Sequence, residues 1–137
     1  MSGRKCPLQK ALYGQANDDV VNLYRIFRDK RLARTEAGRR LIVLYYKHFE
    51  EVSGILEARE ELNREAQKLL LSLAPNMFFG MYGDREISMA ETEHERIAYF
   101  LEQLKETASP ALQADIEELL MQLADGSLQS ELGYKIR

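Results

Sequence analysis

The sequence predicts an all-α protein: a single compact domain of four or five helices in an antiparallel, bundle-like arrangement. Apolar residues recur at helical spacing through most of the 137 residues. The chain has only three prolines and eight glycines, so long helices are allowed. No stretch alternates with period two over a useful length, and we therefore expect no sheet.

Length and composition indicate one globular domain spanning residues 1–137. A chain of this length buries a sizeable core without disulfides. Hydrophobic residues make up 45% and charged residues 30%, which is typical of a folded globular protein. Within this domain we expect a helical hairpin over residues 6–56 and further helices, from residues 57–137, packed on it.

The first helix is expected at about residues 18–33. The Asn17-Asp18-Asp19 run offers a helix cap, with acidic side chains where the helix dipole favours them. Apolar residues then follow at helical spacing, namely Val20, Leu23, Tyr24, Phe27 and Leu32.

Thr35 is the expected cap of the second helix, with Glu36 in its first turn. Residues 41–46 are apolar nearly all round, which predicts a buried central helix. Ser53-Gly54 is a point where the helix can kink or break. The apolar pattern then resumes, and Pro75 is expected to end it.

Residues 76–86 are expected to form the one substantial loop, followed by two more long helices. Ser88 to Glu91 has the pattern of a capping box. The helix that it opens carries an apolar seam that includes His94. Ser109-Pro110 begins the last long helix, and Gly126 ends it.

A cysteine and four short motifs near the start of the chain resemble the CFI-box domain, a bacterial module. The family pattern opens with a cysteine, reaches Tyr-Gly seven residues later, and continues with Phe-Arg-Asp, Gly-Arg and Tyr-Tyr pairs. Here the corresponding residues are Cys6, Tyr13-Gly14, Phe27-Arg28-Asp29, Gly38-Arg39 and Tyr45-Tyr46. The resemblance covers residues 6–56 and implies a bacterial protein and two helices joined by a tight turn. It implies no reaction.

The same block predicts a small polar cluster made of Arg28, Asp29 and Arg39, with a hydroxyl from Tyr13 or Tyr45. One interpretation is a structural clasp between two crossing helices, in which Gly38 allows a second backbone to approach closely. The other is an anion site, because arginines near a helix N-terminus bind phosphate or carboxylate.

Charge is divided between the two parts of the chain. Residues 25–40 hold seven basic residues and two acids, whereas residues 86–131 hold eleven acids and two bases. Two solvated helix faces that attract one another would explain this split. Nucleic-acid binding by the stretch Arg25–Arg40 is the alternative that we do not favour.

Catalytic and metal-binding patterns are weak. Glu91-x-x-His94 and its reverse, His48-x-x-Glu51, lack the further inward carboxylates of a dimetal site, so a hydrogen-bonded core histidine is the better interpretation of His94. Cys6 has no context that would activate a thiol. We expect no cofactor, no metal ion and no enzymatic activity that the residues would identify.

The apolar segment 77–83 is the second candidate site. Phe78, Phe79, Met81 and Tyr82 either cap the end of the bundle or contact a partner. We therefore expect a non-enzymatic helical interaction module that binds another protein or itself. The alternative is a protein that binds small anions or nucleic acid through Arg25–Arg40.

The sequence also predicts a cytoplasmic location without a membrane partner. Its single cysteine forms no intrachain disulfide, and no signal-peptide pattern or apolar run of membrane-spanning length is present.

Overall fold

The computed structural model describes residues 18–82 and 87–137. This part of the chain is almost entirely helical, as predicted, with six α-helices and one 3-10 turn. The helices are α2 (Asp18–Lys30), α3 (Glu36–Ala58), α4 (Glu60–Tyr82), α5 (Glu91–Lys105), α6 (Pro110–Asp125) and α7 (Ser127–Leu132), and the 3-10 turn is η1 (Leu32–Arg34). The strands β1 (Ser88–Met89) and β2 (Lys135–Ile136) are two residues each.

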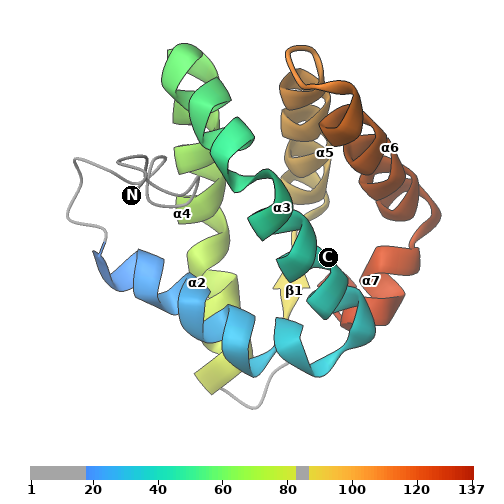
Figure 1. Ribbon diagram of the computed structural model, residues 1–137. Coiled ribbons are helices and arrows are strands. Elements are labelled where there is room, and N and C mark those ends of the chain that lie inside the picture. The colour runs from blue at the N-terminus through green and yellow to red at the C-terminus, as the bar shows by residue number, and fades with distance from the viewer. Residues whose placement is uncertain (1–17, 83–86) are drawn as a thin grey trace.

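Helices α3 to α6 run alternately up and down and form two hairpins, α3–α4 and α5–α6, whose turns lie at the same end of the molecule (Figure 1). The main core lies near those turns. It consists of Leu56, Leu62, Ala66, Leu104, Leu112 and Ile116. Each of the four helices contributes to this cluster, so burial of apolar surface holds the two hairpins together.

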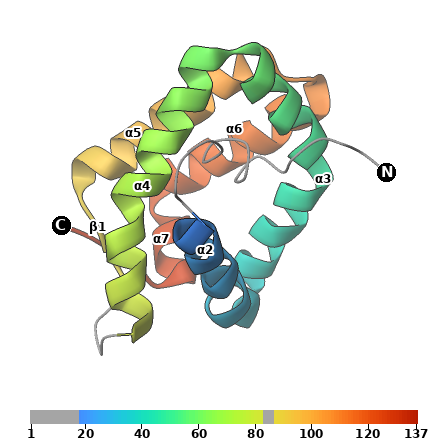
Figure 2. The same cartoon turned by 90° about the vertical axis from the view of Figure 1, so that its left-hand side faces the viewer.

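Away from the turns, the remaining helical elements pack on these four helices. Helix α2 packs across α4, and the 3-10 turn η1 lies against the start of α3. Figure 2, viewed nearly along α2, shows this helix between α3 and α4. On the other side α7 contacts α3 and α6. The α3–α6 pair has few close backbone approaches, so this side of the four-helix arrangement is the least closed.

Several helix ends follow the predicted local chemistry. Thr35 Oγ1 accepts a hydrogen bond from the Gly38 amide (2.9 Å), which caps α3. Ser109 caps α6 with Pro110 in its first turn. Gly126 ends that helix with φ +80, a backbone conformation that costs glycine little.

The predicted break at Ser53-Gly54 is wrong. Helix α3 continues to Ala58, and the break falls at Arg59. Arg59 Nη1 donates to the carbonyl of Gln103 (2.8 Å) and to Thr107 Oγ1 (3.2 Å), at the end of α5. A contact between two hairpin turns therefore fixes the corner, and no local sequence pattern encodes it.

The predicted end at Pro75 is also wrong, because α4 continues through it to Tyr82. The loop expected at residues 76–86 is therefore helix up to residue 82, and residues 83–86 lie outside the described part. Tertiary contacts hold this end of α4 in place. Asn76 donates to Glu93 (3.1 Å), and Arg31 donates to the Gly80 carbonyl (3.2 Å). Their free energy offsets the cost of one proline in a helix interior.

The start of α5 is capped differently from the prediction. Ser88 belongs to β1 and Ala90 is the N-cap. Glu93, three residues after Ala90, accepts a hydrogen bond from the Ala90 amide (3.0 Å). The carboxylate therefore caps the start of α5, two residues further along the chain than predicted.

The prediction that the chain forms no sheet needs a small correction. Strands β1 and β2 pair in parallel, with Ser88 opposite Lys135 and Met89 opposite Ile136. The residues that follow the last predicted helix form α7 and β2. This pairing brings the last described residues back to the start of α5.

The prediction of a buried central helix at residues 41–46 is wrong as well. None of these six side chains is buried, and Val43 is 64% exposed. The other core helices bury their apolar stripes against one another. In this stretch of α3, Leu41, Val43 and Leu44 line the poorly closed side towards α6, whereas Tyr46 contacts Arg28 of α2.

Candidate functional site

Three aromatic rings project from the last turns of α4. Phe78, Phe79 and Tyr82 are 50%, 57% and 56% exposed. The Phe78 ring lies 5.9 Å from Phe79 and 5.0 Å from Tyr82, between ring centroids. We call these three residues the aromatic cluster. Met81, predicted to join them, is half-buried on the same helix.

The helix that carries the aromatic cluster is well anchored. A Cβ placed on Gly80 would lie 2.1 Å from Ile87 Cγ1, so the glycine allows α4 to pack tightly against the residue before β1. Arg31 holds the Gly80 carbonyl from the opposite direction. The rings therefore stand on a fixed backbone, which lowers the entropy cost of presenting them to a partner.

Arg28 and Asp29 form an exposed surface pair rather than the buried cluster that the sequence predicts. Arg28 Nε lies 2.9 Å from Asp29 Oδ1, and the two side chains are 34% and 65% exposed. The hydrogen bond from Arg28 lowers the pKa of the Asp29 carboxyl. Arg28 also donates to the hydroxyl of Tyr46, the second tyrosine of the pair. Tyr45 contacts Tyr46 edge to face, with ring centroids 5.3 Å apart.

Arg39 points elsewhere and donates to the Ala33 carbonyl in η1 (3.0 Å). Gly38 behaves as predicted, because a Cβ at this position would lie 2.0 Å from the carbonyl oxygen of Leu32. The close approach of α3 and η1 thus exists, although the arginine–aspartate pair does not make it. Tyr13, Gly14 and Cys6 lie outside the described residues.

The basic stretch is only partly directed to solvent. Arg31 and Arg39 donate to carbonyls, and Arg40 pairs with Glu131 (2.9 Å) and Glu36 (3.5 Å). The Arg40–Glu131 pair joins the basic and acidic parts of the chain, as the charge split suggested. The remaining basic residues of the stretch, Arg25, Lys30 and Arg34, are exposed.

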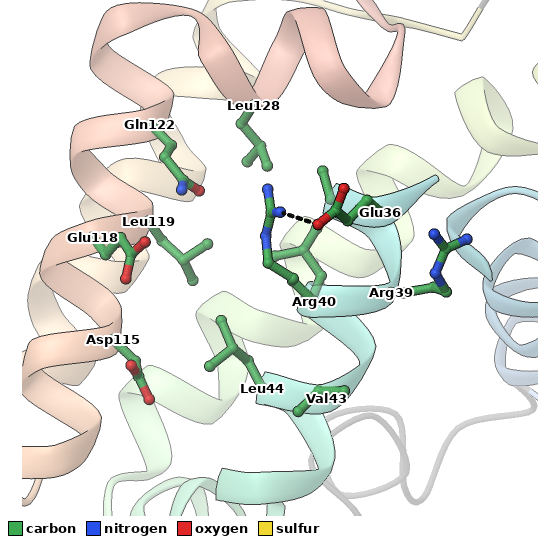
Figure 3. Close-up of a pocket in the computed structure, with 12 residues that line it drawn as sticks. Glu36, Arg39, Arg40, Val43, Leu44, Asp115, Glu118, Leu119, Gln122 and Leu128 are labelled. Carbon is green, nitrogen blue, oxygen red and sulfur yellow. Dashed lines mark ion pairs between the residues drawn. The ribbon is translucent and has the colours of Figure 1, made fainter. Parts of the chain in front are cut away.

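A groove of about 340 Å³ lies between α3 and α6 and is closed at one end by α7 (Figure 3). Its apolar walls come from Leu41, Val43, Leu44, Leu119 and Leu128. Asp115, Glu118 and Gln122 face it from α6, and Arg40 enters it beside Glu36, whereas Arg39 points away (Figure 3). We call this feature the α3–α6 groove.

Asp115 marks the other end of the groove through a polar bridge to α3. Its Oδ2 lies 2.6 Å from His48 Nε2 and 3.1 Å from Lys47 Nζ. Hydrogen bonds from His48 and Lys47 hold the pKa of this carboxyl below its ordinary value. Glu51 adds a second link, because it accepts from the amide and hydroxyl of Ser109 at the start of α6.

A buried carboxylate that the sequence did not single out joins α4, α5 and β2. Glu93 accepts from Ser72 Oγ (2.7 Å), Asn76 Nδ2 and the Ala90 amide, and Arg137 lies 3.8 Å away. Burial alone would raise its pKa, but these donors outweigh burial and hold the pKa of Glu93 below its ordinary value. Its spacing from Ala90 is the one local signal that could have identified it.

His94 behaves as the predicted core histidine. It is half-buried, and its Nε2 lies 3.1 Å from the hydroxyl of Tyr134. Among the residues that the structure describes, no group of three or more His, Cys, Asp or Glu side chains is placed to hold a metal ion. None of the described helices has the length and apolar character needed to span a membrane.

No protein-family model matches the chain, and no curated protein or solved structure is significantly similar to it. The resemblance of residues 6–56 to the CFI-box domain therefore stays a prediction.

Proposed function

We propose that the protein is a non-enzymatic helical interaction module that binds another protein or a second copy of itself through the aromatic cluster. The observation that carries this proposal is the exposure of Phe78, Phe79 and Tyr82, which touch one another on one end of an anchored helix. Contiguous exposed apolar side chains on a folded protein are typical of contact surfaces.

Aromatic side chains supply much of the binding free energy in protein interfaces. A buried tyrosine or phenylalanine removes a large apolar area from water and loses few rotamers when it is fixed. The aromatic cluster offers three such rings, each about half exposed before any partner binds. We also propose a cytoplasmic location, supported by the single cysteine, which suits a reducing compartment.

The test is a double substitution, Phe78→Ser with Phe79→Ser. Self-association is measured by sedimentation equilibrium over a range of concentrations, and partner binding by co-purification followed by a direct titration of the isolated pair. We expect the double variant to lose the association, because the apolar contact area is removed. Far-UV circular dichroism should be unchanged, because both rings are exposed.

Tyr99→Ser is the matched control. Tyr99 is an aromatic residue that is 61% exposed on α5, away from the aromatic cluster. It should leave the association intact. Equal effects of the two variants, or no effect of either on an association that the wild type shows, would contradict the proposal.

Binding of a small anion or nucleic acid through Arg25–Arg40 is a weaker proposal. It is supported by the exposed Arg25, Lys30 and Arg34, whereas Arg31, Arg39 and Arg40 already have partners within the chain. Salt separates the two proposals. A phosphate-driven complex weakens steeply as salt rises, and an apolar contact barely responds.

A further inference from the structure

The α3–α6 groove is flanked by two matching helical stripes. On α3 the stripe is Ala37, Leu41 and Leu44, and on α6 it is Asp115, Leu119 and Gln122. In both cases the spacing is i, i+4, i+7, so each wall is one helix face about two turns, or 10 Å, long. The groove is thus open, elongated and bounded by helices, which suits a helical segment better than an enclosed small molecule.

The apolar character of the α3 wall is not explained by burial within the chain. Residues 41–46 are apolar all round, yet none of these side chains is buried. Val43, which lines the groove, is 64% exposed. Covering this wall would remove apolar surface from water, at about 25 cal/mol per Å².

The charges at the groove identify the kind of segment that fits. Helix α6 carries Asp115, Glu117, Glu118 and Asp125 and has no basic residue. Arg40, the cation that enters the groove, is already paired with Glu36 and Glu131. Asp115 is engaged by His48 and Lys47. Within the described part of the chain the exposed Glu118 has no ion-pair or hydrogen-bond partner, so it forms an acidic rim of the groove.

We propose that the α3–α6 groove binds an amphipathic helix of another protein, whose apolar stripe contacts Leu44 and Leu119 and whose flanking lysines or arginines face Glu118. The opposite charge at Glu118 orients the helix, and the apolar contacts supply most of the affinity. This site is separate from the aromatic cluster on α4 and does not depend on the function proposed for that cluster.

The probe is a synthetic peptide of about 18 residues, long enough to form a helix on binding. It carries leucines at i, i+4 and i+7 and lysines at the flanking positions. A second peptide has glutamates in place of the lysines. We expect the basic peptide to bind more tightly, and we expect it to shift the methyl resonances of Leu44, Leu119 and Leu128 in NMR spectra.

The variant Glu118→Lys, with Glu117→Lys as its control, tests how much the acidic rim contributes to peptide binding. The two residues are adjacent, both are exposed, and only Glu118 lines the groove. Glu118→Lys should weaken binding of the basic peptide about three- to tenfold, as expected for reversing one exposed charge contact. Glu117→Lys should change binding less than about twofold.

The variant Val43→Ser, with Met121→Ser as its control, tests how much the apolar wall contributes to peptide binding. Val43 and Met121 are 64% and 68% exposed, so neither change should unfold the domain. We expect Val43→Ser to weaken binding of the basic peptide about fivefold, and we expect Met121→Ser to leave this binding unchanged.

Three results would overturn the proposal. The first is equal binding of the basic and acidic peptides or equal effects of Glu117→Lys and Glu118→Lys. The second is loss of peptide binding in the Phe78→Ser, Phe79→Ser variant, which would place the peptide on the aromatic cluster. The third is a concentration-dependent dimer that Val43→Ser dissociates and that excludes the peptide, which would make a second copy the occupant.

Discussion

The Glu93 side chain connects α4, the start of α5 and the residue after β2. A carboxylate oxygen that accepts several hydrogen bonds is stable when buried only because its donors are already in place. Its donors come from α4 and from the start of α5, and Arg137 approaches from beyond β2. Removing the charge therefore affects three parts of the structure at once.

Glu93→Gln should lower the free energy of unfolding by about 1–3 kcal/mol at pH 7, because an amide NH₂ would face groups that donate. Urea denaturation measures this, with the exposed Glu95→Gln as control. The pKa of Glu93 is lower in the folded state, so its stabilisation is present above its ordinary pKa and is lost as the pH falls through the folded value. The difference between wild type and Glu93→Gln should therefore shrink below about pH 4. A difference that is constant from pH 7 to pH 3 would contradict this account.

For Asp29, unlike Glu93, we expect little loss of stability when the carboxylate is removed. A structural clasp between the two helices would make Asp29→Ala costly, because the arginine within the clasp would lose its partner. The structure places Asp29 at the surface, 65% exposed. We now expect Asp29→Ala to shift the thermal melting temperature no more than Glu117→Ala, a change of an exposed acid on α6. A clearly larger shift for Asp29→Ala would support the interpretation of this pair as a structural clasp.

Local chemistry explains why some elements were predicted and others were not. The caps at Thr35 and Ser109 and the glycine at Gly126 act within one helical turn, and the sequence showed them. The corner at Arg59 depends on a contact with Gln103, and the helix beyond Pro75 depends on contacts with Arg31 and Glu93. Such contacts join residues far apart in the chain, and periodicity does not reveal them.

The candidate sites, too, were predictable only where local sequence determines them. The apolar composition of residues 77–83 was enough to single out Phe78, Phe79 and Tyr82, although it did not reveal that they stand on a helix. The α3–α6 groove was missed because apolar residues at helical spacing indicate burial, and only the packing shows that residues 41–46 remain partly exposed. Glu93 was missed because its donors lie on another helix.

Gly38→Ala tests the closest approach between two elements. The new methyl group would meet the backbone carbonyl of Leu32, and a backbone cannot move aside as a flexible side chain can. We expect a loss of about 2 kcal/mol or more in the free energy of unfolding. Gly126→Ala is the comparison, because it has open space around its Cβ position but a positive φ, and it should cost about 1 kcal/mol. Equal costs would mean that α3 can move away from η1 freely.

The described part of the chain consists of two helical hairpins that share a core near their turns and are linked elsewhere by helix α7, by charges and by one short pair of strands. One charge link, Arg40–Glu131, runs from the basic part to the acidic part, and Lys47–Asp115 adds a second link between α3 and α6. The strand link consists of hydrogen bonds from Lys135 N to Ile87 O (2.9 Å) and from Arg137 N to Met89 O (2.8 Å).

Deleting residues 133–137 should therefore weaken the whole molecule and not only its C-terminal part. Both strand hydrogen bonds, the Tyr134–His94 contact and the Arg137–Glu93 contact would be lost. We expect a loss on the order of 2 kcal/mol in urea denaturation. Arg137→Ala keeps the backbone bonds and should cost less than half as much. If the deletion changes nothing, the strand pair does not hold the hairpins together.

The parallel pairing of β1 with β2 also has a consequence for how the protein is made. On the ribosome, residues 88–89 emerge long before residues 135–136, so β1 waits without its partner while α5, α6 and α7 are synthesised. Until then the Glu93 carboxylate on the nascent chain lacks the Arg137 cation. The two hairpins can collapse early, but the strand pair can form only after residues 135–136 have emerged.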